Sequence, residues 1–374
     1  MSGAPAAPQP KRVLVWGAGA IGGTIGAHAA REGHEVTFVD NDAAHVAAIR
    51  EHGLRIIGPI SEFAVSAPAY LPQDVTGTWD MVLLCVKAHH TGPATAELVP
   101  RLAPGGYVVS LQNGLNEHTI SRQIGSDRTV GAFVNFGADV LEPGVVHFSG
   151  RGAVVVGELD GRTSERVADV LSILRCAEPD AIATDNIWGY LWGKMAYGAM
   201  LFATALTDDS IADVLANPDA RDTLTALALE VSTVTAAEGV TPRGFNGYDP
   251  AAFAPDGQDR TAQSASFDAM EAFNRRSAKA RSGVWRDLAV RHRKTEVDGQ
   301  FLPILEMAVQ HGIAVPHLIK LVDLIHEVED GLRPRDMTAL QAISETGSTE
   351  QGADVRRGQV FSEAKSKEED ATSR

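Results

Sequence analysis

The stretch Arg12-Val-Leu-Val-Trp-Gly-Ala-Gly-Ala-Ile-Gly22 decides the fold of this chain. Its short apolar run meets a glycine at Gly17, which is typical of a buried parallel strand that ends in a tight turn. The residues that follow predict a helix over 21–31, capped by Gly33, and a second strand over 35–39. We therefore expect a right-handed, doubly wound α/β sheet of the Rossmann type for this half of the chain.

The glycines of the turn have the Gly-x-Gly-x-x-Gly spacing of a dinucleotide site. Gly17 permits the sharp turn, Gly19 lets backbone amides approach a pyrophosphate, and Gly22 lets the helix pack closely on the strand. The motif alone is weak evidence, but here a strand precedes it and a helix follows it. The predicted cofactor-binding residues of the turn are Gly17, Ala18, Gly19, Ala20, Ile21 and Gly22.

Asp40 lies at the end of the second predicted strand, 18 residues after Gly22. A carboxylate at this place accepts hydrogen bonds from the adenosine ribose hydroxyls and repels a 2′-phosphate. Positions 41–44 hold Asn, Asp, Ala and Ala, so no basic residue is available for that phosphate. The sequence therefore predicts NAD as the cofactor in preference to NADP. The alternative is that Asp40 is a simple turn residue.

Two further polar residues follow predicted strands of the same sheet. Lys87 comes directly after the strand over 81–86, and Asn113 follows the strand over 107–111. Ligands of such sheets gather beyond the carboxyl ends of the strands, so both are candidate site residues. A solvated lysine and a structural turn asparagine are equally open interpretations.

Changes in composition and periodicity predict four segments. They are a flexible leader over 1–11, a dinucleotide-binding domain over 12–178, an all-helical substrate domain over 179–340 and a disordered polar tail over 341–374. Residues 243–262 are rich in Gly, Pro, Asp and Gln, and we expect a long loop there that could act as a lid.

Bulk properties exclude several classes of function. The net charge of −15 argues against a nucleic-acid partner, and no apolar run is long enough to span a bilayer. Cys85 and Cys176 are the only cysteines, too few for a disulfide framework or a metal cluster, and we expect no metal site. A reducing cytoplasm is the expected location, with a small-molecule substrate as partner; a homodimer is left open.

The sequence resembles the ketopantoate reductase family over about residues 12–335. The resemblance rests on the glycine turn together with Val86-Lys87, Gln112-Asn113-Gly114, Trp192-Gly-Lys194, Lys294-Thr-Glu-Val-Asp-Gly299 and His311-Gly-Ile-Ala-Val-Pro316. It implies a Rossmann domain, a helical second domain and a substrate cleft between them. It also implies Lys194 as the proton donor, Glu296 as a carboxylate near the nicotinamide and the substrate hydroxyl, Asn113 as a contact of cofactor and substrate, and Lys87 as a lysine on the cofactor side.

The chain also departs from the family pattern. Gly198 and Phe202 stand where the family has asparagines, and Gly283 stands where it has a serine, with one inserted residue before Glu296 blurring that alignment. Asp40 replaces the basic residue that the family uses for a 2′-phosphate. We therefore expect a substrate other than ketopantoate, with Arg281, Trp285 and Arg286 as candidates for a different specificity surface.

Three functions compete. The favoured one is an NAD-dependent dehydrogenase that moves hydride between nicotinamide and the carbonyl or alcohol carbon of a small hydroxy acid or secondary alcohol. In this function Lys194 is the general acid and base, and Glu296 is an orienting carboxylate. The second is an NADPH-dependent 2-dehydropantoate 2-reductase of pantothenate synthesis. The third is a non-catalytic NAD-sensing binding protein, for which retention of both Lys194 and Glu296 is unexpected.

Overall fold

The structure is a computed structural model that describes residues 10–257, 259–276 and 280–348. Its contacts divide the chain into two units, which we describe one at a time. The first unit comprises Met1–Met195, Val240–Asn246 and Phe273–Ala280, and the second comprises Ala196–Gly239, Gly247–Ala272 and Arg281–Arg374. The sequence placed the main boundary at 178, whereas the contacts place it after Met195.

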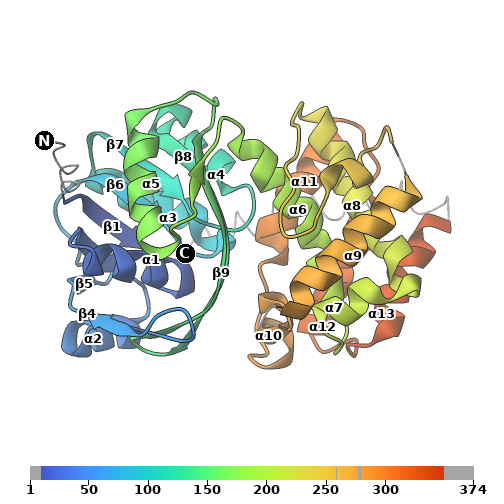
Figure 1. The fold of residues 1–374 in the computed structure, drawn as a ribbon, viewed down its shortest axis with the longest axis horizontal. Coiled ribbons are helices and arrows are strands. Elements are labelled where there is room, and N and C mark those ends of the chain that lie inside the picture. Colours follow the sequence, from blue (N-terminus) through green and yellow to red (C-terminus); the bar gives the residue numbers. More distant parts are fainter. Residues whose placement is uncertain (1–9, 258, 277–279, 349–374) are drawn as a thin grey trace, which may run out of the picture. The chain divides into compact units, whose positions relative to one another are not determined.

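The first unit is built on one mixed sheet (Figure 1). Its strand order is β4-β3-β9-β8-β7-β6-β1-β2-β5, and β10 pairs with β9. The strands are β1 (Arg12–Trp16), β2 (Glu35–Val39), β3 (Leu54–Ile57), β4 (Phe63–Val65), β5 (Ala69–Tyr70), β6 (Trp79–Leu84), β7 (Leu102–Ser110), β8 (Thr129–Glu142), β9 (Val145–Glu158) and β10 (Ile182–Ala183). Within it, β5-β2-β1-β6-β7-β8 are parallel neighbours. Taken in chain order, these strands have the 3-2-1-4-5-6 arrangement of a Rossmann fold, which confirms the predicted fold class.

Antiparallel strand pairs extend this parallel sheet. The sequence prediction did not include these antiparallel pairs. β8 pairs with β9, and β3 pairs with β4, in antiparallel fashion. The short turn at Pro143-Gly144 explains the first pair, since a connection of this length joins only antiparallel strands. Gly144 there has a positive φ of 77°.

Helices cover both faces of the sheet, because successive side chains of a strand point to opposite faces. Val13 and Val15 of β1 belong to one core cluster, while Leu14 and Trp16 belong to the other. The first cluster lies under α1 (Ala20–Arg31), α2 (Ala43–His52) and α5 (Glu165–Ala177), and the second lies under α3 (Thr91–Leu98) and α4 (Asn116–Ile124). The sheet is thus buried on both sides, as its near-continuous apolar strands require.

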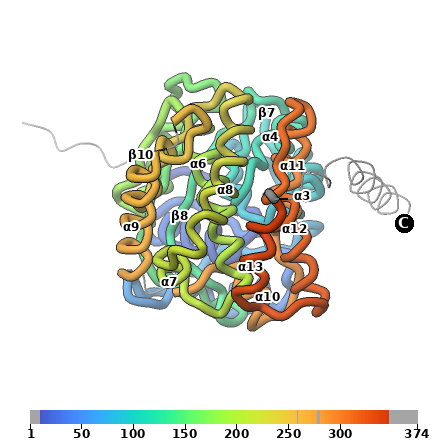
Figure 2. The backbone as a smooth tube through the Cα atoms, turned by 90° about the vertical axis from the view of Figure 1, so that its right-hand side faces the viewer, coloured from blue at the N-terminus to red at the C-terminus, as the bar shows by residue number. Residues whose placement is uncertain are grey.

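The second unit is helical, as predicted. Its elements are α6 (Ile187–Thr204, which begins in the first unit), α7 (Ile211–Ala216), α8 (Pro218–Ala237), α9 (Arg260–Arg276, which ends in the first unit), α10 (Gly283–Ala289), α11 (Val297–Gln310), α12 (Pro316–Glu329) and α13 (Met337–Ser344). Figure 2 shows α8 in the middle of these helices, and it contacts α7, α11, α12 and α13. Short 3₁₀ helices are η1 (Ala88–His90), η2 (Val99–Arg101), η3 (Ser126–Arg128), η4 (Pro250–Phe253) and η5 (Glu345–Ser348).

Ordered structure extends into both predicted flexible ends. Helical structure continues through α13 and η5 to Ser348, where a disordered tail was expected from 341. The physical reason is that Asp336 caps α13 through the backbone amides of Thr338 and Ala339, while the Leu340 and Ile343 side chains are buried. At the other end, Lys11 forms an ion pair with Asp169. The rest of these two predictions, over 1–9 and 349–374, lies outside the described residues.

The segment 243–262 is mostly irregular up to α9, as predicted, but its aromatic side chains are buried. Tyr248 and Phe253 are 2% and 0% exposed, and their rings stack with centroids 5.4 Å apart. In the part of the chain that the structure describes, no helix is both long and apolar enough to cross a membrane.

Candidate functional site

The glycine turn between β1 and α1 is closed on one side and open on the other. Gly17 has a φ of +100°, and a Cβ there would lie 2.9 Å from the carbonyl carbon of Cys85. A Cβ on Gly22 would lie 2.1 Å from the Gly17 carbonyl oxygen, so neither position accepts a side chain. A Cβ on Gly19, by contrast, would have no described atom within 4 Å. The turn therefore has room for a ligand at Gly19, beside the backbone amides of the helix start.

The remaining residues of the turn form its support. Ala18 is fully buried, while Ala20 and Ile21 are half-buried in the first turn of α1. His45 of α2 holds the turn from the side, since its Nε2 lies 3.0 Å from the Ala18 carbonyl oxygen. The Gly144 amide donates to His45 Nδ1, so Nε2 carries the proton that Ala18 accepts. The sequence provided no signal for this histidine, because its partners are distant along the chain.

Asp40 lies at the end of β2 and contacts the same turn. Its Oδ2 accepts a hydrogen bond of 2.8 Å from the Ala18 amide, and its Oδ1 accepts one of 3.0 Å from the Asp42 amide. The carboxylate is half-buried. The structure thus brings Asp40 and the glycine turn together, as the motif requires.

Lys87 and Asn113 lie beyond the carboxyl ends of β6 and β7, which are neighbouring strands. β6 ends at Leu84, two residues earlier than predicted, and Lys87 directly precedes η1. β7 ends at Ser110, and Asn113 is exposed in the turn before α4. Both residues therefore lie at the carboxyl edge of the parallel strands, which is where open α/β sheets generally bind ligands.

Lys194 of α6 is brought to this edge although it is 81 residues from Asn113. Its Nζ donates a hydrogen bond of 2.7 Å to Asn113 Oδ1 and one of 2.6 Å to the Val134 carbonyl oxygen. The ammonium also lies 5.3 Å from the centre of the Phe133 ring. Two neutral oxygens and an aromatic face thus hold the ammonium in place. Close packing of α6 requires Gly193, where a Cβ would lie 2.3 Å from the Arg243 carbonyl oxygen.

A buried hydrogen-bond network holds the turn that contains Asn113. Gln112 Nε2 donates to the Val86 carbonyl oxygen at 2.8 Å and to Thr91 Oγ1 at 2.7 Å. Thr91 Oγ1 donates to Asn116 Oδ1 at 2.8 Å, and Asn116 Nδ2 donates to the Asn113 carbonyl oxygen at 2.6 Å. This network ties the loops after β6 and β7 together, so that the places of Lys87 and Asn113 depend on each other.

Glu117 is a further acidic residue next to this network that the sequence did not single out. It lies in the first turn of α4 and is 0% exposed. Burial raises its pKa to about 7, against smaller opposing effects of its own backbone amide, the Ser110 hydroxyl and the Lys194 charge. An acidic residue in a first helical turn is usually solvated, which is why composition and spacing gave no signal for it.

Glu296 belongs to the second unit and lies directly before α11. It is half-buried. The cations beside it in sequence pair elsewhere: Arg293 Nε lies 2.9 Å from Asp287 Oδ1, and Lys294 Nζ lies 2.6 Å from Asp330 Oδ1. Each of these two cations is thus paired with another acid of the second unit.

Three of the positions at which the chain departs from the family pattern, Gly198, Phe202 and Gly283, also lie in the second unit. Gly198 of α6 is half-buried, and a Cβ there would have no described atom within 4 Å. Phe202, one helical turn later, is 3% exposed and packs edge-to-face on Phe301 with ring centres 5.0 Å apart. Gly283 is exposed in the first turn of α10, and Ser282 before it caps the helix through the Trp285 amide.

Arg281 and Trp285 are engaged in a structural cluster around Asp208. The Arg281 Nε donates to the Asp208 carbonyl oxygen at 3.1 Å, and Trp285 Nε1 donates to Asp208 Oδ1 at 3.2 Å. The Arg281 and Arg335 guanidinium groups lie 4.6 and 5.5 Å from the Trp285 ring centre. These contacts give both residues a role in holding α10, and the proposed specificity surface gains no support from them. Arg286 is half-buried on the same helix.

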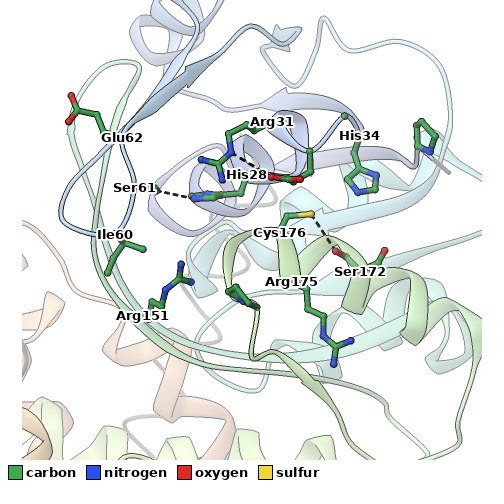
Figure 3. Close-up of a pocket in the computed structure, with 14 residues that line it drawn as sticks. His28, Arg31, His34, Ile60, Ser61, Glu62, Arg151, Ser172, Arg175 and Cys176 are labelled. Carbon is green, nitrogen blue, oxygen red and sulfur yellow. Dashed lines mark hydrogen bonds and ion pairs between the residues drawn. The ribbon is translucent and has the colours of Figure 1, made fainter. Parts of the chain in front are cut away.

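A cavity of about 880 Å³ lies at the C-terminal end of α1, between the β3–β4 loop and α5 (Figure 3). It is lined by Arg31, Arg151 and Arg175, among others. Arg151 is paired with Glu178 at 3.1 Å, and Arg175 Nε donates to the Ala181 carbonyl oxygen at 3.0 Å. The glycine turn is at the opposite end of α1, so this cavity is separate from the predicted cofactor site. Within the described residues, no cluster of His, Cys, Asp and Glu has the arrangement of a metal site.

A 3-2-1-4-5-6 parallel sheet with an open glycine turn at a helix N-terminus defines a dinucleotide-binding protein of the Rossmann class. The first part of the chain matches the family model of ketopantoate reductase PanE/ApbA over residues 13–161, and the second matches the C-terminal model of the same family over residues 186–329. The chain belongs to the ketopantoate reductase family. This is a family of oxidoreductases that act on CH–OH groups and bind a nicotinamide cofactor.

Curated relatives match the chain over almost their full length. A 2-dehydropantoate 2-reductase of Halobacterium salinarum is 29% identical over 317 residues, which are 84% of this chain and 97% of the relative. One from Archaeoglobus fulgidus is 29% identical over 328 residues, 86% of this chain and 99% of the relative.

Solved structures share the fold. A PanE/ApbA family ketopantoate reductase from Ralstonia eutropha has a TM-score of 0.72 and 26% identity, covering 86% of this chain and 99% of that one. A D-mandelate dehydrogenase in complex with NADH and anilino(oxo)acetate has a TM-score of 0.74 and 22% identity at the same coverage. The second likeness concerns the fold alone.

Proposed function

We propose that this protein is an NAD-dependent dehydrogenase that transfers hydride between the nicotinamide and the carbonyl or alcohol carbon of a small hydroxy acid or secondary alcohol. The observation that carries the proposal is the placement of the Lys194 ammonium at the ligand-binding edge of the sheet. Its hydrogen bonds to Asn113 Oδ1 and the Val134 carbonyl oxygen, 2.7 and 2.6 Å long, hold it there.

Lys194 provides the acid and base that the reaction needs. The bound cofactor supplies or accepts the hydride, and the substrate oxygen must gain or lose a proton in the same conversion. In the direction of reduction, Lys194 Nζ donates a proton to the oxygen of the carbonyl and is left neutral. In the direction of oxidation, neutral Lys194 takes the hydroxyl proton. Asn113 orients the ammonium in both directions, because its Oδ1 accepts one of the Nζ hydrogens.

The glycine turn and Asp40 would hold the cofactor. The open side of the turn at Gly19 fits a pyrophosphate, and the amides at the start of α1 are donors for it. Asp40 supports NAD in preference to NADP, since its carboxylate contacts the turn and would repel a 2′-phosphate. Lys87, at the neighbouring strand end, is a further cofactor contact in this proposal.

Glu296 is the carboxylate that we propose for binding the substrate hydroxyl. Its support is the Lys294–Gly299 motif and its place directly before α11. Gly198, where a Cβ would meet no described atom within 4 Å, supports a less polar substrate environment than the asparagine of the family pattern would provide. Phe202 is 3% exposed and packs on Phe301.

The second candidate is an NADPH-dependent 2-dehydropantoate 2-reductase. The observation in its favour is the match to curated enzymes of this name over 97–99% of their length. The two candidates share Lys194 and Glu296 and differ in cofactor and substrate. Asp40 favours the cofactor of the first candidate, and Gly198 favours a substrate other than ketopantoate.

A panel of 2-hydroxy acids, secondary alcohols, their ketones and ketopantoate, each tested with both cofactors, decides between the two by nicotinamide absorbance. We expect turnover with NAD or NADH and little or none with NADPH and ketopantoate. The Lys194→Ala variant should lose about 10²- to 10⁴-fold in kcat and keep its cofactor affinity. Lys320→Ala, a lysine of α12, is the control and should retain full activity.

Preferred use of NADPH with ketopantoate would overturn the first candidate. Cofactor binding without turnover of any compound would instead support the sensing function. Full activity in Lys194→Ala would remove the acid–base role on which both enzymatic candidates rest.

A further inference from the structure

Glu117 is a fully buried carboxylic acid that the proposed mechanism does not use. Neither carboxylate oxygen has a hydrogen-bonding partner of normal geometry among the described residues. Acidic side chains are almost never fully buried without a partner, because ionising them away from water is costly. An apolar residue would fill this place in α4 without that cost. The presence of a carboxylic acid at position 117 is therefore not explained by packing alone.

Two hydrogen bonds connect the residue that precedes Glu117 to Lys194. Asn116, the preceding residue, donates to the Asn113 carbonyl oxygen at 2.6 Å, and Lys194 Nζ donates to Asn113 Oδ1 at 2.7 Å. The hydroxyl of Ser110, buried at the end of β7, also lowers the pKa of Glu117. Glu117, Ser110 and Lys194 are all part of the first unit.

Lys194 is the charged side chain that acts on Glu117. Its positive charge lowers the pKa of Glu117, while burial, the larger effect, raises it to about 7. The other titratable groups near α4 that we compare with Lys194 are exposed, lie at the far end of the helix or stack on an aromatic ring. Glu97 of α3 is exposed, Asp127 and Arg128 of η3 follow the far end of α4, and His118 stacks on Trp188. Lys194 is the charged group that shifts the pKa of Glu117, so the electrostatic coupling is that between the Glu117 carboxyl and the Lys194 ammonium.

We propose that Glu117 is a positioning residue that sets the protonation state of Lys194. The interaction is reciprocal: a charge on Lys194 favours ionised Glu117, and ionised Glu117 must favour a charged Lys194 to the same extent. Ionised Glu117 thus keeps Lys194 protonated, ready to donate to a carbonyl oxygen. Protonated Glu117 makes it easier for Lys194 to become the neutral base that oxidation requires. This inference rests on the acid–base role of Lys194 in the proposed function.

The conversion stays balanced without a proton transfer from Glu117 to the substrate. During reduction the substrate oxygen gains the Lys194 proton, and the neutral amine regains a proton from water. Loss of the ammonium charge removes the field that favours ionised Glu117, so Glu117 takes up protons more readily at that stage. When Lys194 loses its proton, uptake of a proton by Glu117 offsets part of the lost positive charge. The total charge of Glu117 and Lys194 therefore changes less than the charge of Lys194 alone.

Glu117→Gln tests the inference, because the amide keeps the size of the side chain and remains neutral at every pH. The pH dependence of Lys194 itself is measured by competitive labelling with acetic anhydride and quantification of the Lys194 peptide by mass spectrometry. We expect the midpoint of Lys194 reactivity to move to lower pH by about 0.5 to 1 pH unit, a three- to tenfold change in protonation equilibrium. With an identified substrate, oxidation near neutral pH should rise and reduction at alkaline pH should fall.

Two variants serve as comparisons. Glu117→Asp retains a carboxyl and should leave the midpoint closer to that of the wild type. Ser110→Ala removes a group that favours the ionised carboxyl and should shift the midpoint in the same direction as Glu117→Gln, by less. Because an uncompensated buried acid is removed, Glu117→Gln should melt at an equal or higher temperature than the wild type above pH 7.

An unchanged midpoint of Lys194 reactivity in folded Glu117→Gln would overturn the inference. If Glu117→Gln does not fold, the Ser110→Ala midpoint decides in its place, and no shift there counts against the inference. The labelling needs no substrate, so these outcomes are distinct from failure of the proposed function. That failure would appear as full activity in Lys194→Ala.

Discussion

The Asp40 carboxylate accepts a hydrogen bond of 2.8 Å from the backbone amide of Ala18. The acid at the end of β2 therefore supports the glycine turn, in addition to the role in cofactor binding that we propose for it. Any substitution of Asp40 changes both properties, unless the new side chain keeps an acceptor at the same place.

Asp40→Asn separates the two properties, because its amide oxygen can still accept from Ala18 while the negative charge is lost. We expect the ratio of kcat/KM for NADP over NAD to rise by about tenfold or more, since repulsion of the 2′-phosphate is removed. Steady-state kinetics with both cofactors measure this. Asp42→Asn is the matched control, as it removes a nearby charge and retains a capping side chain for α2. A ratio that rises equally in both variants would contradict the role of Asp40.

The two glycines Gly19 and Gly22 should respond differently to alanine. Gly22→Ala places a methyl group against the Gly17 carbonyl oxygen, so we expect a loss of stability of about 1–3 kcal/mol. Gly19→Ala meets open space, so the melting temperature should be unchanged. The added methyl should nevertheless weaken cofactor binding in calorimetric titration, because it occupies the place proposed for the pyrophosphate. Equal cofactor affinity of Gly19→Ala and wild type would argue against that placement.

Glu296→Gln should lower kcat/KM by about 10- to 100-fold, since an amide binds a substrate hydroxyl less strongly than a carboxylate does. Glu306→Gln provides the same chemical change on the exposed face of α11 and should have no effect. Cofactor affinity should be unchanged in both variants. If both retain wild-type kinetics on a confirmed substrate, Glu296 has no role in catalysis.

An ion cluster next to Glu296 predicts a pH window of stability. Hydrogen bonds to Asp298 and Glu329 raise the pKa of His326 from 6.5 to about 9. Burial acts to raise the pKa of Glu329, but hydrogen bonds from His326 and Thr295 outweigh it and lower that pKa from 4.5 to about 2. The contribution of His326 is complete below pH 6.5 and is lost as the pH rises through 9. That of Glu329 is complete above pH 4.5 and is lost as the pH falls through 2.

His326→Gln tests this window by thermal melting across pH. The melting temperature of the variant should lie furthest below that of the wild type between about pH 4.5 and 6.5 and approach it above about pH 9. A difference that does not vary with pH would mean that His326 acts through packing alone.

The order of local elements was predictable because it depends on short-range patterns. A strand that meets Gly17, a helix that ends before Gly33 and an acid at Asp40 are defined by neighbouring residues and their spacing. The predicted ends of elements were less accurate: the strand predicted over 81–86 ends at Leu84. The predicted disorder from 341 was wrong up to Ser348, because burial of Leu340 and Ile343 stabilises α13.

The sequence alone was sufficient for the glycine turn, the alternation of strands and helices, and the family resemblance, because each of these is written in residue types at short or regular spacing. Only the tertiary structure decided that Lys194 meets Asn113 across 81 residues, that Arg281 and Trp285 are tied to Asp208, and that Glu117 is excluded from water. Distances, burial and charge coupling arise from which elements pack together. They cannot be obtained from the periodicity of any one element.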